Sequence, residues 1–133
     1  MRIIKANLKN LPEVIKAIKE NKILVYPTDT VYGLICNAIN KKAVKKIFLI
    51  KKRSRKNPIP IFVKDLKMAK KLAKISKNQE RFLKSVWPGK ITVVFNRKKI
   101  KMKLYGVNKK TIALRIPNYK LVNILLEKLN KPL

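Results

Sequence analysis

Short apolar runs alternate with amphipathic helical patterns along the whole chain, and this alternation constrains the fold more than any other feature. Five apolar runs are predicted as strands, at residues 2–4, 23–26, 59–63, 91–95 and 111–116. Helical spacing predicts helices at about residues 10–20, 40–50, 65–73 and 76–86, and a last one with Leu121, Leu125 and Leu129. Because these elements alternate without a repeat, we expect one α/β domain over residues 1–133, with a central sheet between helices.

Four of these helices begin with a residue whose side chain can cap free backbone N–H groups. Two have the spacing of a capping box, Ser76 with Gln79 and Asn10 with Glu13. Single caps are expected at Asn40 and Asp65. The first two helices are expected to face the core with Val14, Ile15 and Ile18, and with Ala43, Val44, Ile47, Phe48 and Ile50.

The composition excludes several classes of site. With 47% hydrophobic residues in 133, the chain can bury a modest core. The absence of histidine excludes Ser–His and Cys–His nucleophile pairs and histidine-based zinc sites. The lone Cys36 excludes an internal disulfide and is expected in the core. Because no run of about 18 apolar residues occurs, we expect a cytoplasmic protein without a membrane partner.

The chain contains only three glycines, Gly33, Gly89 and Gly106, so neither common glycine-rich phosphate loop can be built from it. A triphosphate would therefore need side-chain cations, isolated backbone donors or a helix N-terminus. The candidate is the run of mostly cationic residues at 51–56, which follows the second predicted helix. The alternative is that these cations only complement the negative end of the helix dipole.

The net charge of +29, from 35 Lys and Arg against six acids, favours a polyanionic partner. We expect contact with tRNA or double-stranded RNA through its phosphates rather than its bases. Few of the cations are arginine, however, and a biased genome composition that inflates lysine is the alternative explanation.

A polar loop follows the predicted strand at 23–26. Pro27 ends the strand, and residues 28–33 then bring two hydroxyls, a carboxylate, a phenol and a glycine. Loops on rigid scaffolds often bind ligands, although a plain turn with an Asx-type cap at Asp29 fits the same residues.

This loop belongs to the first of four stretches that follow one another in a recognisable order along the chain. They are residues 26–34; residues 43–48, which lead into 51–54 and 57–59; Trp87-Pro88-Gly89 through Thr92; and residues 111–117. Together they resemble the YrdC-like family, the threonylcarbamoyl-AMP synthases. The resemblance implies a twisted open mixed sheet with flanking helices. It also implies formation of L-threonylcarbamoyladenylate and pyrophosphate from L-threonine, bicarbonate or CO2, and ATP, for threonylcarbamoyl modification of tRNA adenosine.

The resemblance also implies roles for single residues. Thr28 and Arg115 match positions that contact L-threonine, and the ATP positions are Lys51, Arg53, Arg55 and Thr111. It indicates no catalytic residue, no metal ligands and no tightly bound cofactor, and Mg²⁺ is expected to arrive with ATP. Arg115 is unusual in an apolar strand unless an anionic group meets it, and the alternative is a surface arginine on an edge strand. Asp29 is either a general base or a residue that shapes the loop.

In the family, the position of residues 131–133 leads into a further strand and a Ser-Ala-Asn element, which this sequence lacks. We therefore expect a catalytically incomplete domain, or one half of a split enzyme with a complementing C-terminal chain. Two other interpretations remain open. One is a catalytically silent RNA-binding module, and the other is the related carbamoyl-transfer domain of hydrogenase maturation factors.

Overall fold

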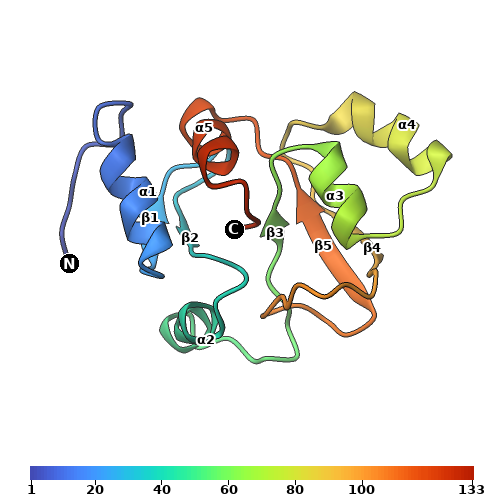
Figure 1. The fold of residues 1–133 in the computed structure, drawn as a ribbon, viewed down its shortest axis with the longest axis horizontal. Coiled ribbons are helices and arrows are strands. Elements are labelled where there is room, and N and C mark those ends of the chain that lie inside the picture. Colours follow the sequence, from blue (N-terminus) through green and yellow to red (C-terminus); the bar gives the residue numbers. More distant parts are fainter.

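The computed structural model describes all 133 residues and contains five helices and five strands, whose arrangement is drawn in Figure 1. In chain order they are α1 (Leu11–Lys19), β1 (Leu24–Tyr26), β2 (Gly33–Ile35), α2 (Lys41–Ile50), β3 (Ile61–Phe62), α3 (Leu66–Leu72), α4 (Lys77–Val86), β4 (Val93–Asn96), β5 (Thr111–Arg115) and α5 (Lys120–Leu129). The predicted alternation of helices and strands is confirmed, apart from the first strand and an additional strand, β2.

The strands form two sheets. β1 and β2 make an antiparallel pair, and the other sheet has the order β3-β5-β4. In that sheet β5 is parallel to β3 and antiparallel to β4, so the predicted mixed sheet is confirmed. Beside β3, Leu133 exchanges two backbone hydrogen bonds with Phe62, of 2.8 and 3.1 Å. This reciprocal pairing is the pattern of an antiparallel ladder.

The main core lies on one face of the three-stranded sheet, where α3 and α4 cover it (Figure 1). Ile112 and Leu114 of β5 pack there with Leu72, Leu83 and the ring of Trp87. A second cluster joins α1, α5 and the β1–β2 pair, and a third gathers around α2. Helices α3 and α4 thus leave the opposite face of the three-stranded sheet uncovered.

The first predicted strand, at residues 2–4, does not form. Ile3 is 83% exposed, and no strand pairs with this segment. Instead Arg2 forms an ion pair with Glu13 at 2.7 Å. An apolar triplet is not enough for a strand, because its backbone groups need a neighbouring strand.

The predicted caps are confirmed at Asn40, Asp65 and Ser76, and the Ser76–Gln79 capping box is complete. The capping box at Asn10 is wrong. The Asn10 side-chain amide donates to the Lys5 carbonyl at 2.9 Å, while Glu13 is held by Arg2. Ile50 is also not in the core but 53% exposed, because the last turn of α2 extends beyond the cluster that Ile47 and Phe48 reach.

Candidate functional site

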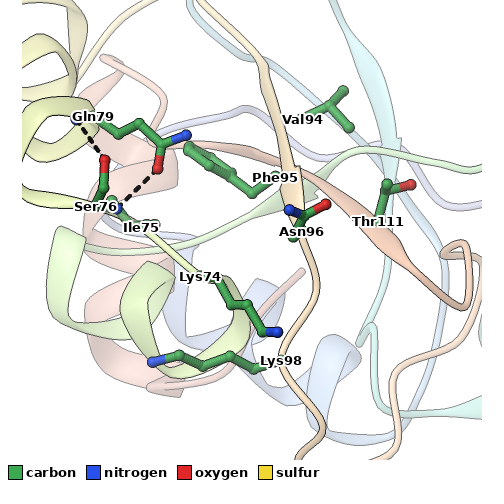
Figure 2. Close-up of a pocket in the computed structure, with 9 residues that line it drawn as sticks. All are labelled: Lys74, Ile75, Ser76, Gln79, Val94, Phe95, Asn96, Lys98 and Thr111. Carbon is green, nitrogen blue, oxygen red and sulfur yellow. Dashed lines mark hydrogen bonds between the residues drawn. The ribbon is translucent and has the colours of Figure 1, made fainter.

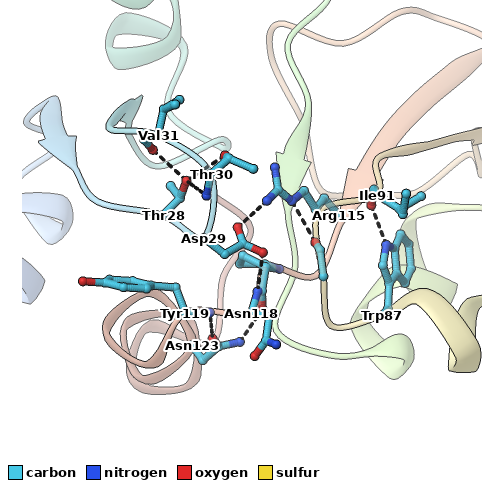
Figure 3. A network of polar contacts seen from close by, with 12 residues as sticks. Thr28, Asp29, Thr30, Val31, Trp87, Ile91, Arg115, Asn118, Tyr119 and Asn123 are labelled. Carbon is cyan, nitrogen blue, oxygen red and sulfur yellow. Dashed lines mark hydrogen bonds and ion pairs between the residues drawn. The ribbon is translucent and has the colours of Figure 1, made fainter.

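A buried ion pair connects two distant parts of the chain. Arg115 is the last residue of β5, and its Nη2 donates to Oδ1 of Asp29, in the loop of residues 27–32 between β1 and β2 (Figure 3). The side chains are only 10% and 7% exposed. Such burial is costly for unpaired charges, so each of the two groups depends on the other.

Two further contacts orient the Arg115 guanidinium. Its Nε donates to the carbonyl of Gly89 at 3.0 Å, and its Cζ lies 5.6 Å from the ring centroid of Phe62. A guanidinium has five N–H donors, and the structure uses two of them, one at Nε and one at Nη2. The three remaining N–H groups, two of them on Nη1, make no hydrogen bond within the protein. Their hydrogen-bonding capacity is therefore unused within the protein.

The Trp87-Pro88-Gly89 turn fixes the carbonyl that Arg115 contacts. Trp87 Nε1 donates to the Ile91 carbonyl at 2.7 Å, and the Gly89 N–H donates to the Ile116 carbonyl at 2.8 Å. A Cβ at position 89 would lie 2.6 Å from the Val86 carbonyl oxygen, so the close approach requires glycine.

Two contacts of Asp29 hold the 27–32 loop in place, the ion pair with Arg115 and a hydrogen bond from Asn118. Asp29 Oδ2 accepts from the backbone N–H of Asn118 at 2.9 Å, beyond the end of β5. Inside the loop, Thr28 Oγ1 donates to the Val31 carbonyl at 2.7 Å and accepts from the Thr30 N–H at 3.2 Å. The predicted threonine-binding hydroxyl thus takes part in a hydrogen-bonded turn, and the loop next to Arg115 has a defined shape.

Thr111 and Arg115 lie on the same face of β5, because side chains alternate along a strand. This is the face opposite to the main core, and we call it the open face. Its other residues, by strand register, are Ala113, Phe62, Val94 and Asn96. Val94, on the edge strand β4, is 63% exposed, so this edge of the face is accessible, whereas Phe62 at the other edge packs against the second core cluster. Thr111 and Arg115 are about 13 Å apart, four strand residues at about 3.3 Å each.

The Thr111 end of the open face borders an open groove of about 640 Å³. Figure 2 shows Thr111, Val94 and Asn96 along it, with Lys74 and Lys98 at the Asn96 end. Lys98 Nζ is already bound to the Lys70 carbonyl, at 2.6 Å. Hydroxyl, amide and ammonium groups thus line this groove, at the end of β5 opposite to Arg115.

The predicted phosphate-binding cations all lie in the exposed segment after α2. Lys51 is the C-cap of this helix, and Arg53 donates to the carbonyls of Asn57 and Pro58 at 2.8 and 2.9 Å. Neither Lys51 nor Arg55 forms an ion pair. This segment leads into β3, and the Ile59 N–H donates to the carbonyl of Gly106, in the segment before β5, at 2.8 Å.

The structure therefore brings the predicted threonine residues together and separates them from the predicted ATP residues. Thr28 lies in the loop that Asp29 holds against Arg115 at the C-terminal end of β5, although no hydrogen bond joins Thr28 to Arg115. Thr111 is the first residue of β5, at the end opposite to Arg115, and the 51–56 segment leads to Ile59, which pairs with Gly106 before β5. Sequence reasoning missed the Gly89 carbonyl, the Asn118 N–H and Phe62, and no local sequence signal points to them.

Cys36 is buried among apolar side chains, as predicted. Burial raises the pKa of its thiol to about 11. The group is therefore protonated near neutral pH, when a nucleophile would need the thiolate. No three His, Cys, Asp or Glu side chains gather closely enough to hold a metal ion. None of the helices has the length and apolar character that crossing a bilayer requires.

Comparisons with known proteins identify the family and the fold. The profile of the Sua5–yciO–yrdC family, described as "Telomere recombination", matches residues 16–133. A threonylcarbamoyl-AMP synthase of Pyrococcus abyssi is 34% identical over 87% of this chain, which covers 34% of that protein. One of Bacillus subtilis is 31% identical over 93% of this chain, which covers 37% of it. The chain thus spans about a third of either relative.

A solved structure shows the same fold. The crystal structure of P. abyssi Sua5 complexed with L-threonine superimposes on 97% of this chain with a TM-score of 0.82 and 30% identity. The match covers 38% of the Sua5 chain.

Proposed function

The chain belongs to the Sua5–yciO–yrdC family, and we propose that it acts in the synthesis of threonylcarbamoyl-AMP. In this proposal L-threonine, bicarbonate or CO2, and ATP are the substrates. The threonine amine and bicarbonate form a carbamate with loss of water, and with CO2 the same addition releases a proton. A carbamate oxygen then attacks the α-phosphorus of ATP, and pyrophosphate leaves.

The observation that best supports the proposal is the state of Arg115. Its guanidinium is buried and oriented, yet three of its N–H donors make no hydrogen bond in the protein. A planar guanidinium binds a carboxylate with two parallel hydrogen bonds, and the carboxylate of L-threonine fits this geometry. Thr28 lies one residue from Asp29, so a side-chain hydroxyl is close to the same point.

The opposite end of the open face suits the nucleotide. We propose that Lys51, Arg53 and Arg55 contact the phosphates and that Thr111 contacts the nucleotide. The separation of about 13 Å between Thr111 and Arg115 leaves room for both substrates between them. Mg²⁺ would enter as part of the MgATP substrate. Little proton transfer is needed from the protein, since positioning two anions and neutralising the triphosphate carry most of the catalysis.

Pyrophosphate release tests the proposal directly. The 133-residue chain is incubated with MgATP, and pyrophosphate is measured with and without L-threonine and bicarbonate. We expect slow release, as for a catalytically incomplete domain, that depends on both, and loss of that dependence in Arg115→Ala. The matched control is Arg81→Ala, because Arg81 is an exposed arginine of α4 without an ion pair. Release that is indifferent to L-threonine contradicts the proposal.

A contact with tRNA is proposed as a second part of the function. It is supported by the net charge of +29 and by the run of exposed cations at 51–56. Phosphate contacts of this kind position an RNA without reading its sequence. A cytoplasmic location follows from the same proposal, because the product would modify tRNA there.

A further inference from the structure

Asp29 is unlike the five other acidic residues of the chain. The side chains of Glu13, Glu20, Asp65, Glu80 and Glu127 are between 22% and 61% exposed, whereas that of Asp29 is 7% exposed. Each of these five also interacts with lysine or arginine at the surface, where such pairs contribute little. A buried carboxylate in a chain with a net charge of +29 therefore calls for a specific explanation.

We infer that Asp29 is a positioning residue, which presents the Arg115 guanidinium to a carboxylate ligand and holds the 27–32 loop beside it. This inference rests on the proposed function, because it takes the carboxylate to be that of L-threonine. Asp29 is assigned no contact with the substrate and acts only through Arg115 and the loop.

The hydrogen bonds of Asp29 support this role. Oδ1 accepts from Arg115 Nη2, and Oδ2 accepts from the Asn118 N–H at 2.9 Å. One carboxylate therefore connects the loop to both the end of β5 and the segment that leads into α5 (Figure 3). Removing it frees the loop at both points at once.

The same contacts argue against Asp29 as a general base. A base needs a free lone pair within reach of the substrate proton. Each oxygen of Asp29 already accepts one hydrogen bond, from Arg115 or from the Asn118 N–H, and the side chain is only 7% exposed, so these partners and the burial shield its remaining lone pairs. Arg115 in turn keeps three N–H donors that make no hydrogen bond in the protein and suit an anion.

The Asp29–Arg115 pair is expected to increase the affinity for L-threonine because the guanidinium is oriented before the ligand binds. A free arginine side chain loses rotamer freedom when a ligand fixes it, which weakens binding. Here Asp29, the Gly89 carbonyl and the Phe62 ring already fix the guanidinium without a ligand. We therefore expect Asp29 to change the affinity for L-threonine although it does not touch it.

The test compares Asp29→Asn with Asp29→Glu in the 133-residue chain. Calorimetry measures L-threonine and ATP affinity, and side-chain ¹⁵N NMR follows the Arg115 guanidinium. Only five other arginines are present: Arg2, Arg53, Arg55, Arg81 and Arg97. We expect Asp29→Asn to shift and sharpen the Arg115 signals toward a freely rotating group and to weaken L-threonine binding about tenfold or more. ATP affinity is expected to stay within about threefold, and Asp29→Glu, which keeps the charge, to restore part of the L-threonine affinity.

The matched control is Asp65→Asn, the same chemical change in a helix cap that an asparagine can replace. It is expected to leave both affinities unchanged. The inference is overturned if Asp29→Asn binds L-threonine as wild type does, or if the Arg115 signals are unaffected. If the wild-type chain binds no L-threonine, the proposed function fails. A changed Arg115 signal then marks the pair as structural only, which also overturns the inference.

Discussion

Asp29 and Arg115 are 86 residues apart in the sequence, and they form the only ion pair of the protein in which both side chains are buried. In every other ion pair at least one side chain is 40% exposed or more. The pair joins a loop to the end of the central strand of the larger sheet. This one ion pair thus contributes to both the fold and the candidate site. Substitution of either residue should therefore change both protein stability and ligand binding.

Replacing Arg115 with alanine is expected to weaken L-threonine binding by about 10- to 150-fold, since a charge-assisted hydrogen bond contributes about 1.5–3 kcal/mol. ATP binding should change much less, because the predicted ATP residues lie toward the other end of β5. Calorimetric titration with each ligand measures both. Equal losses for the two ligands, or no loss for L-threonine, contradict the assignment of Arg115.

The same substitution should also lower stability, because it leaves Asp29 buried without its partner. Breaking a buried pair in this way costs about 3–5 kcal/mol. Urea unfolding followed by circular dichroism measures the loss. The double variant Arg115→Ala with Asp29→Ala removes both charges and should recover part of it. If the double variant is no more stable than the single one, the pair does not behave as a coupled buried unit.

Gly89→Ala is expected to destabilise the protein by about 1–3 kcal/mol, since a new Cβ would lie 2.6 Å from the Val86 carbonyl oxygen. The turn has to shift, which moves the carbonyl that accepts from Arg115 Nε. The matched control is Gly33→Ala, because nothing lies within 4 Å of a Cβ built there. Unfolding free energies in urea decide the comparison. Equal effects at both positions would refute the steric argument.

Cys36 is expected to react slowly with iodoacetamide in the native protein. Burial raises the pKa of its thiol from 9.0 to about 11, and only the thiolate is an effective nucleophile. Between pH 7 and 9 the urea-unfolded chain should therefore react much faster than the folded one. Mass spectrometry of samples quenched over time measures both rates. Similar rates in the folded and unfolded chains would show that Cys36 is not shielded.

Local patterns in the sequence predict most elements, because each depends on neighbouring residues. The stripe of Ala43, Val44, Ile47 and Phe48 predicts the buried side of α2, and Ser76 with Gln79 predicts the start of α4. Two predictions fail, one because another local contact competes with the predicted one and one because no partner strand is present. Asn10 can bind the Lys5 carbonyl instead of capping α1, and residues 2–4 have no strand to pair with. β2 is only three residues long, which is too short for a periodic signal.

Only part of the candidate site can be predicted from the sequence. Family resemblance identifies Thr28, Arg115 and Thr111 one by one, but no local pattern shows that Asp29 reaches across 86 residues to Arg115. That contact depends on how the small β1–β2 sheet packs beside the end of β5. The Gly89 carbonyl and the Asn118 N–H are backbone groups, which any residue type except proline at position 118 could supply. Sequence alone therefore cannot mark them.

RNA binding is expected to depend steeply on salt, with little preference for sequence. Each phosphate that a cation neutralises releases counterions, so the logarithm of affinity falls linearly with the logarithm of salt, by about 0.7–0.9 per contact. Replacing Lys51, Lys52, Arg55 and Lys56 with glutamine should lower this slope by up to about 3. The matched control replaces four exposed lysines without ion pairs, Lys9, Lys19, Lys120 and Lys128. Fluorescence anisotropy with a labelled tRNA, from low to high salt, measures the slopes. If both sets lower the slope equally, the 51–56 segment is no special phosphate contact. If the wild-type slope is flat, the proposed RNA contact is wrong, and the excess of lysine reflects composition alone.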